Sequence, residues 1–188
     1  MTRTDHAPGL TAALFAGVIP PDGEEPLAEA AGAALACAGY ALRHGGYNGL
    51  MEAAARGAAR HGVPVTAITL ADRPGWGALN PHVTTTIYAP TMGERLHAYL
   101  DGVDLVVAMG GGVGTLHELT AALYYATTIR SVPVRLLGPT ACRLGAFLRA
   151  EGWLIETPTR PLDFLRELPD AEALDADLKA LDGGRRAW

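Results

Sequence analysis

The chain has 188 residues, of which 49% are hydrophobic and 19% are charged, and its formal net charge is −5. These values indicate one globular domain that can bury a full hydrophobic core, and they exclude a disordered chain. The negative charge and the scattered arginines argue against nucleic acid as a partner, whereas one phosphate of a small-molecule nucleotide needs only a few N–H groups and one arginine.

The first apolar segment, at 10–19, has two interpretations. It could be the core of a signal peptide, but no clear basic segment precedes it and Pro20-Pro21 follow it, so we predict the first strand of a sheet. Residues 1–9 are expected to be a loose N-terminal extension. No apolar run is long enough to span a membrane, and we expect a cytoplasmic protein with no membrane partner.

Short apolar segments and longer helical segments alternate along the rest of the chain. This alternation predicts a single Rossmann-like α/β domain over residues 1–188, in which helices cover both faces of a parallel sheet. Cys37 and Cys142 have no metal-binding or redox spacing and are predicted to be core residues in a reducing compartment. Strands are expected at 10–19, 40–42, 63–70, 84–88, 103–109, 133–137 and 153–155. Helices are expected at 24–38, 50–58, 92–102, 115–125, 141–150 and 161–168, followed by a helical tail at 170–188 with a helix at 171–181.

The strand at 103–109 is followed at once by a turn with four glycines in five residues, 110–114. Such a backbone can take positive φ and lets a ligand approach closely. Because a helix begins directly after the turn, free N–H groups and the helix dipole favour an anion there, and we predict a phosphate site. A Walker A loop is excluded because no lysine is near, and the G-x-G-x-G spacing does not match a dinucleotide fingerprint. The candidate phosphate-binding residues are Gly111, Gly112, Val113, Gly114 and Thr115.

Thr115 and Glu118 also allow a purely structural interpretation. Thr-x-x-Glu at a helix start is a capping box, in which each side chain bonds a backbone N–H of the first turn. The glycines upstream are unnecessary for a cap and favour a ligand site, and the two roles are compatible.

A second glycine turn, His44-Gly45-Gly46-Tyr47-Asn48-Gly49, also lies between a predicted strand and a helix. Since the carboxyl ends of parallel strands share one edge of a sheet, we expect this turn to meet the first one there, beside Gly17 near the end of the first strand. The alternative is an ordinary tight turn with Gly49 as a helix N-cap. The candidate ligand-binding residues of this turn are Gly45, Gly46 and Gly49.

The segment 73–81 is rich in turn residues and is a candidate lid or rim of the site. Tyr47 and Trp76 could stack on a base, although aromatic residues this sparse usually serve the core. His117, a lone histidine at a helix start, is more often structural than ligand-binding.

The two glycine turns and the segment Met92-Gly93-Glu94-Arg95 together resemble the Lonely-guy family, whose members are cytokinin-activating nucleoside 5′-monophosphate phosphoribohydrolases. The turn from Gly110 to Glu118 resembles the family's P-G-G-x-G-T-x-x-E motif. His44 to Met51 resembles its G-G-G-x-x-G-L-M segment, and Met92 to Arg95 resembles its M-x-x-R-K segment. The chain departs from these motifs at Gly110 in place of proline, at His44 in place of the first glycine and at Leu96 in place of lysine. The turn after the first strand also lacks the family's serines.

The resemblance implies hydrolysis of the N-glycosidic bond of a nucleoside 5′-monophosphate, which releases the free base and ribose 5-phosphate. By resemblance, Glu118 is the carboxylate that stabilises an oxocarbenium-like state and positions or deprotonates water. Arg95 corresponds to the family's catalytic arginine, with Met92 beside it at the substrate site. The resemblance also implies a homodimer with sites near the interface, and the reaction needs neither a metal nor a cofactor.

Two alternatives accompany this interpretation. The superfamily also contains molybdenum-cofactor carriers and other nucleotide-ligand binders with similar glycine loops, so the chain could be a non-catalytic carrier of a phosphorylated ligand. Arg95 could instead be a solvated helix residue paired with Glu94 or with a downstream acid. If it orients the substrate, we expect Arg95→Ala to abolish turnover with little loss of stability, because an exposed helix arginine contributes little. The pair of Arg95 and Glu118 distinguishes the two functions, because hydrolysis requires the pair and carriage does not.

Overall fold

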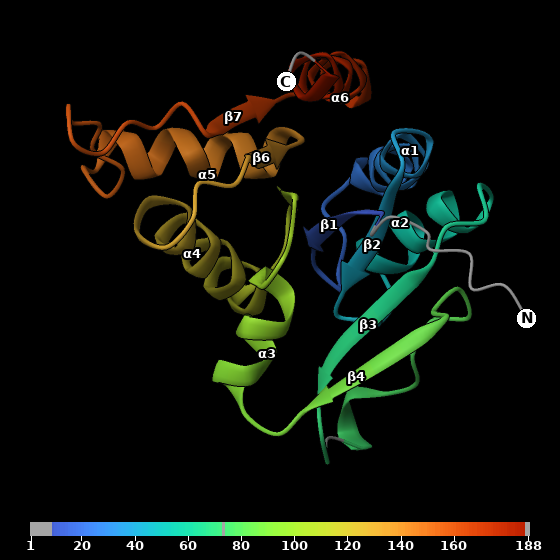
Figure 1. Cartoon of the computed structure of the whole chain (residues 1–188). Helices are drawn as coiled ribbons and strands as arrows, with labels where there is room; N and C mark the ends of the chain where they lie inside the picture. Colours follow the sequence, from blue (N-terminus) through green and yellow to red (C-terminus); the bar gives the residue numbers. More distant parts are fainter. Residues whose placement is uncertain (1–8, 73, 187–188) are drawn as a thin grey trace, which may run out of the picture.

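The computed structural model describes residues 9–72 and 74–186, so nearly all of the predicted extension at 1–9 lies outside the described residues. Within that part of the chain, seven strands form one fully parallel sheet in the order β4-β3-β2-β1-β5-β6-β7 (Figure 1), which confirms the predicted Rossmann-like α/β fold. The strands are β1 (Leu10–Phe15), β2 (Tyr40–His44), β3 (Val65–Leu70), β4 (Thr85–Ala89), β5 (Leu105–Ala108), β6 (Val134–Leu137) and β7 (Leu165–Leu168). The helices are α1 (Glu24–Cys37), α2 (Leu50–Ala59), α3 (Met92–Leu100), α4 (Val113–Thr128), α5 (Pro139–Ala150) and α6 (Ala171–Arg186), with a 3₁₀ turn at Pro74–Trp76.

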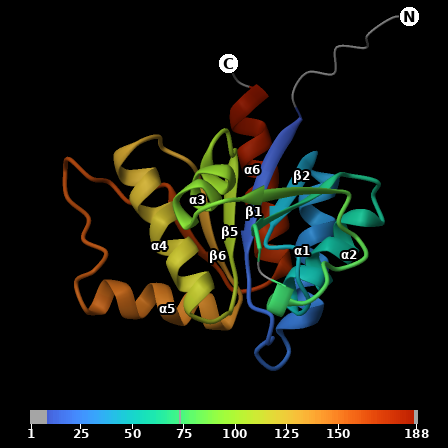
Figure 2. The same cartoon turned by 90° about the horizontal axis from the view of Figure 1, so that it is seen from below.

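Helices cover both faces of the sheet, with α1, α2 and α6 on one face and α3, α4 and α5 on the other (Figures 1 and 2). Each face therefore has its own apolar core. Along β1, Leu14 belongs to the first core and its neighbour Phe15 to the second. All four residues of β5 are buried because helices cover the strand on both sides, which explains the continuous apolar run in the sequence.

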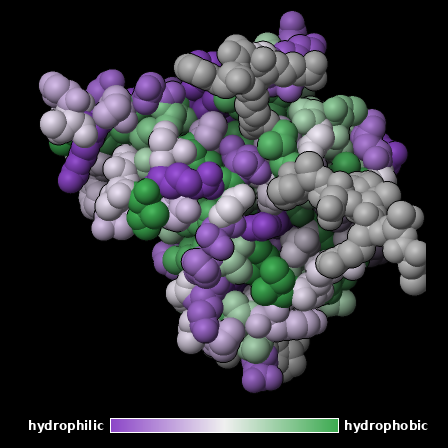
Figure 3. Space-filling model, in the orientation of Figure 1, coloured by the Kyte–Doolittle hydropathy of each residue, from purple (hydrophilic) through white to green (hydrophobic). Residues whose placement is uncertain are grey.

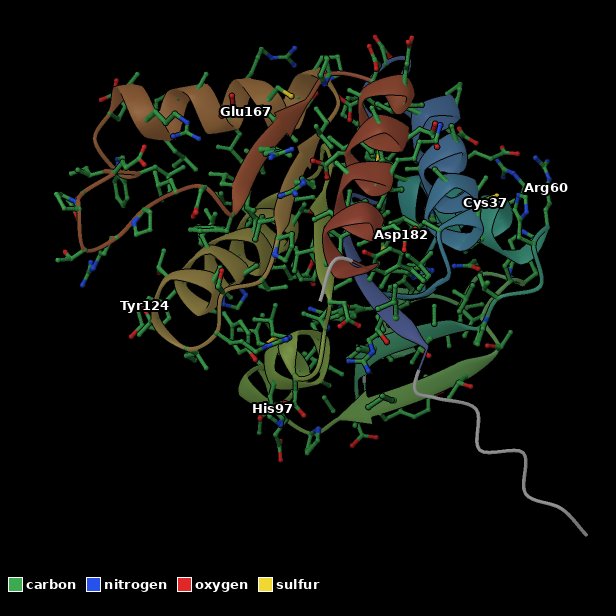
Figure 4. All side chains as sticks on the ribbon, turned by 45° about the horizontal axis from the view of Figure 1, so that its top comes forward. Cys37, Arg60, His97, Tyr124, Glu167 and Asp182 are labelled. Carbon is green, nitrogen blue, oxygen red and sulfur yellow. The ribbon has the colours of Figure 1, made fainter. Side chains whose placement is uncertain are left out.

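The alanine-rich helices α1 and α2 approach each other closely because glycines remove side chains at their contact points. A Cβ added to Gly32 would overlap the Ala54 carbonyl, and one added to Gly57 would overlap the Glu29 carbonyl. Cys37, at the end of α1, is exposed (labelled in Figure 4), so the prediction that it is a core residue is wrong.

None of the described helices combines the length and the apolarity that a membrane-spanning helix needs. On the face drawn in Figure 3, hydrophobic side chains form small patches between polar ones.

The C-terminal part of the sheet differs from the prediction. The segment 153–155, predicted as a strand, forms a bend after α5 and is not part of the sheet. Trp153 is 77% exposed, and only Leu154 packs against the second core. The last strand is β7, within the segment 161–168 for which the sequence predicts a helix. Only the end residues of β7, Leu165 and Leu168, are buried, so its sequence carries neither an apolar run nor an alternation.

Ionic contacts secure the last two elements. Arg135 on β6 is buried, and its Nε donates to Asp177 Oδ2 of α6 at 2.6 Å. Arg166 on β7 donates to the other oxygen, Asp177 Oδ1, at 2.9 Å. On the opposite side of β7, Glu167 pairs with Arg149 of α5 at 3.2 Å (Figure 4). These contacts tie α6 to the last two strands of the sheet. Detaching α6 would be costly, because it would leave the buried Arg135 without its carboxylate partner.

The strand order reverses between β1 and β5, which are neighbours in the sheet. From β1 the chain continues to β2 on one side, and from β5 it continues to β6 on the other. In open α/β sheets, ligands bind outside the carboxyl ends of the strands at such a switch point. The glycine turns after β1, β2 and β5 leave the sheet at this place.

Candidate functional site

A cleft of about 390 Å³ lies at the switch point. Several of its walls are backbone rather than side chain, and three of its lining residues carry the polar side chains Thr115, Arg95 and Glu118. The lining residues are Ala16, Gly17, Val18, Gly45, Tyr47, Met51, Trp76, Arg95, Gly112, Gly114, Thr115 and Glu118.

The glycine turn after β5 places the start of α4 at the cleft. Gly112 is the N-cap, α4 begins at Val113, and no side chain caps the helix. The first intrahelical bond is made by the Leu116 N–H to the Gly112 carbonyl at 3.0 Å, so the preceding N–H groups of the first turn have no intrahelical partner. Thr115 is thus the third residue of the helix, and the alternative that Thr115 and Glu118 form a capping box is wrong.

The turns after β1, β2 and β5 contact one another through their backbones, which confirms that the two glycine turns meet at one edge. The Gly17 N–H donates to the Gly110 carbonyl at 2.9 Å, and the Gly17 carbonyl accepts from the Leu50 N–H at 3.0 Å. A Cβ on Gly17 would lie 2.7 Å from Gly111 Cα. Gly49 has a φ of 71°, and a Cβ there would overlap the Val18 carbonyl. These positions admit no side chain.

The loop between β3 and β4 supplies one wall of the cleft, as expected of a rim. Its Asn80 side chain donates to the Gly46 and Tyr47 carbonyls at 3.0 and 3.1 Å, which fastens the loop to the second glycine turn. Trp76 and Tyr47 then meet edge to face, with ring centroids 5.8 Å apart. The Tyr47 hydroxyl is held by the Thr69 hydroxyl at 2.5 Å.

Arg95 is only 8% exposed, so the alternative of a solvated arginine is wrong. Its ionic partner is the downstream acid Glu118 and not Glu94. Its Nη2 lies 2.9 Å from Glu118 Oε1, and Nη2 also donates to the Tyr99 hydroxyl at 2.9 Å. Its Nε donates to the Ile68 carbonyl at 3.2 Å. The guanidinium is therefore fixed in orientation. Removing it should cost substantial stability, contrary to the expectation from the sequence.

Glu118 lies in the second turn of α4, faces Arg95 of α3 and is 7% exposed. Burial raises the pKa of Glu118 from 4.5 to about 7, and the Arg95 guanidinium opposes this shift. A carboxyl group with a pKa near neutrality can both accept and donate a proton at physiological pH. Burial also raises the pKa of Tyr99, so its hydroxyl remains a neutral hydrogen-bond donor.

Residues 16–156 match the model of the SLOG cluster4 family. The match covers most of the chain and every residue of the cleft. The chain belongs to the SLOG cluster4 family. No curated protein matches its sequence significantly.

Three solved structures resemble this SLOG cluster4 chain in fold. The protein TM1055 is 20% identical with a TM-score of 0.70, over 91% of this chain and 99% of that one. The molybdenum cofactor binding protein of Rippkaea orientalis is 21% identical with a TM-score of 0.71, over 92% and 96%. The molybdenum cofactor carrier protein of Chlamydomonas reinhardtii is 21% identical with a TM-score of 0.70, over 93% and 98%.

The SLOG cluster4 chain does not bring every predicted site residue into the cleft. Met92 is 41% exposed and Val113 84% exposed, and neither lines it. Gly46, Gly49 and Gly111 shape the turns without lining the cleft. Among the lining residues, Ala16 and Val18 carry no polar signal, and only their positions next to Gly17 could have indicated them. Met51 ends the segment that resembles the family's G-G-G-x-x-G-L-M motif, and that match is its only signal.

A second cleft, of about 350 Å³, lies between α4 and the loop after α5. Apolar side chains dominate its lining, which includes Trp153 and Tyr124 (Tyr124 is labelled in Figure 4), and Arg160 is the single charged side chain among the described residues that line it. It has no glycine turn and no carboxylate, so of these two clefts the one at the switch point is equipped for chemistry.

His44, which replaces a motif glycine, is fully buried at the end of β2. Its Nδ1 accepts the Gly46 N–H at 2.8 Å, and its Nε2 has no hydrogen-bond partner among the described residues. Burial lowers the pKa of His44 from 6.5 to about 4. The neutral ring thus holds the second glycine turn, and protonation would replace its acceptor with a donor.

We expect acid to destabilise the chain through His44. In the unfolded chain His44 is protonated below about pH 6.5, whereas in the folded chain it stays neutral down to about pH 4. The stability that the neutral ring contributes at pH 7 is therefore lost as the pH falls through this window. Relative to His44→Gln, the wild-type free energy of unfolding should drop by about 2 kcal/mol between pH 7 and pH 5. Urea titrations at both pH values measure this difference.

His97→Gln changes an exposed histidine of α3 (Figure 4) and is the matched control. It should leave the pH dependence as in the wild type. A wild-type curve parallel to that of His44→Gln would contradict the role of His44.

Proposed function

We propose that the cleft binds a small phosphorylated ligand with a flat heterocycle and carries it. The phosphate would lie on the uncapped first turn of α4, and the ring would lie toward Tyr47 and Trp76. The observation that carries this proposal is the glycine turn that opens into a helix of sixteen residues with no side-chain cap, directly beside the buried cation of Arg95. Free N–H groups and a helix dipole favour an anion of this kind.

The relatives support carriage as the use of this site. Two of the similar structures are named as a molybdenum cofactor binding protein and a molybdenum cofactor carrier. That cofactor is a phosphorylated pterin, and its phosphate and fused ring are the two features that the cleft is equipped to hold.

Hydrolysis of a nucleoside 5′-monophosphate is the second candidate, and the contact of Arg95 with Glu118 favours it. In this reaction water attacks C1′ of the ribose, the C1′–N bond breaks, its electron pair leaves with the base, and a proton is delivered to the base nitrogen. Glu118, with a pKa near 7, can take the proton from water and stabilise the oxocarbenium-like state. Similarity to the Lonely-guy motifs supports the same assignment, and it also implies a homodimer, which sedimentation velocity can check.

The phosphate is the first feature to test. Calorimetric titration with AMP and with adenosine should give at least a hundredfold tighter binding of AMP, because several charge-assisted hydrogen bonds to the phosphate are worth about 1.5–3 kcal/mol each. Equal affinity for the two would contradict the phosphate site.

The two candidate functions separate in one further experiment. The protein is incubated with AMP, CMP, an N6-substituted AMP and a pterin phosphate, and the mixture is separated by chromatography. Released base would establish hydrolysis, whereas retained and unchanged ligand would establish carriage.

A further inference from the structure

A buried carboxylate lies behind the phosphate-binding turn. Glu24, the first residue of α1, is 3% exposed and forms no ion pair with a cation in the described ranges. Its Oε2 accepts the Gly110 N–H at 3.2 Å, and its Oε1 accepts the Thr140 N–H at 2.9 Å. Both oxygens are therefore occupied by backbone groups of two different turns.

These bonds complete a chain of contacts across four turns at the carboxyl edge of the sheet. The Leu50 N–H bonds the Gly17 carbonyl, and the Gly17 N–H bonds the Gly110 carbonyl. The Gly110 N–H then bonds Glu24, which also holds Thr140 at the start of α5. Gly110 is fixed from both sides, by its carbonyl and by its N–H.

Gly110 and Glu24 are matched in shape as well as in bonding. A Cβ on Gly110 would lie 2.6 Å from Glu24 Oε2 and 2.6 Å from Pro21 Cγ. Proline, which the similar motif has at this position, would add that Cβ and would remove the N–H that Glu24 accepts. The departure from the motif at Gly110 is thus explained by the carboxylate beneath it.

We propose that Glu24 is a positioning residue that fixes the turn from Gly110 to Gly112, and with it the first turn of α4 relative to Arg95. Charge-assisted bonds to backbone N–H groups are stronger than neutral ones, so this side chain fixes the N–H side of the turn while the Gly17 N–H holds its carbonyl side. The remaining N–H groups of the turn and of the helix start are left for the ligand. This inference rests on the proposed function of the cleft.

Glu24→Gln tests the inference, because an amide has one oxygen and must present its NH₂ to one of the two N–H donors. AMP affinity should fall by roughly tenfold or more, while adenosine affinity should stay unchanged, since only the phosphate contacts move. A merely structural role would change both affinities alike or neither. Glu25→Gln, which removes a charge from the next, exposed residue, should leave AMP binding as in the wild type.

Amide hydrogen exchange, followed by NMR without ligand, provides a measurement that does not depend on the proposed function. In Glu24→Gln the Gly17, Gly110 and Thr140 amides should exchange at least about tenfold faster than in Glu25→Gln. Unchanged exchange at these amides would overturn the inference even if AMP binds. If the amides exchange faster in Glu24→Gln but the wild type does not bind AMP, Glu24 still fixes the turn. In that case the proposed ligand is wrong.

Gly110→Ala gives a second variant in case Glu24→Gln does not fold. Its methyl group must displace either the carboxylate or Pro21, so it should weaken AMP binding and leave adenosine binding unchanged in the same way. Normal AMP affinity in a folded Gly110→Ala protein would contradict the close fit between Gly110 and Glu24.

Discussion

Arg95→Ala is expected to lower the free energy of unfolding by about 3–5 kcal/mol at pH 8, because it leaves the carboxylate of Glu118 buried without its cation. The cost should be smaller at pH 6, where Glu118 without Arg95 can take up a proton. Binding of AMP should also be lost, since the guanidinium is the one cation among the described residues that line the cleft. Chemical unfolding at both pH values and calorimetry with AMP measure the two effects.

Arg60→Ala is the control for this loss, since Arg60 is an exposed arginine at the end of α2 with a surface ion pair (Figure 4). It should change stability by no more than about 1 kcal/mol and should leave AMP binding intact. Equal stability of Arg95→Ala and the wild type at pH 8 would show that the buried pair contributes nothing to the fold.

Glu118→Gln is expected to separate binding from cleavage. The amide keeps the shape of the side chain and can still accept a hydrogen bond from Arg95, while the negative charge near the phosphate is removed. At pH 8 the affinity for AMP should therefore rise by roughly tenfold, because the repulsion between the carboxylate and the phosphate disappears and the charge of Arg95 is no longer neutralised by Glu118. If the wild type releases base, the rate in the variant should fall by roughly a hundredfold or more, the usual contribution of a general acid or base.

The same variant tests the protonation of Glu118. Since its folded pKa of about 7 lies above the ordinary value of 4.5, the folded chain holds a proton that the unfolded chain has released between these pH values. The contribution of Glu118 to stability is thus greatest at low pH and is lost as the pH rises through 7. Wild-type stability should fall across this window relative to Glu118→Gln, whereas Glu94→Gln, on the exposed side of α3, should follow the wild type.

The glycine turns and the alternation of strands and helices could be predicted from the sequence, because their physical causes lie between residues that are close in the chain. A β-branched run buried on both faces, a turn without side chains and a helix start are adjacent in sequence at 103–118, so the fold and the uncapped helix start at the cleft could be predicted from that stretch. The meeting of two glycine turns followed from one property of parallel sheets, that carboxyl ends share an edge.

The parts that could not be predicted depend on contacts distant in sequence. Arg95 lies in an ordinary amphipathic helix. The motif resemblance places it at one site with Glu118, but only the fold shows that it is buried and bonded to Ile68 and Tyr99. The role of Glu24 depends on a partner 86 positions away. β7 has four residues with two charged ones in the middle, and its pairing with β6 and the ionic contacts of α6 override its weak local signal.

The helix that carries Arg95 connects the edge strand β4 to the central strand β5, so this connection passes over β3, β2 and β1. The phosphate turn, by contrast, is built at the switch point itself. An insertion or deletion within 90–104 would move the arginine away from Glu118 without altering a single residue of the glycine turns. The helix that carries the arginine and the glycine turn that forms the proposed phosphate site thus lie on separate segments of the chain, and the length of the first segment decides whether Arg95 can reach Glu118.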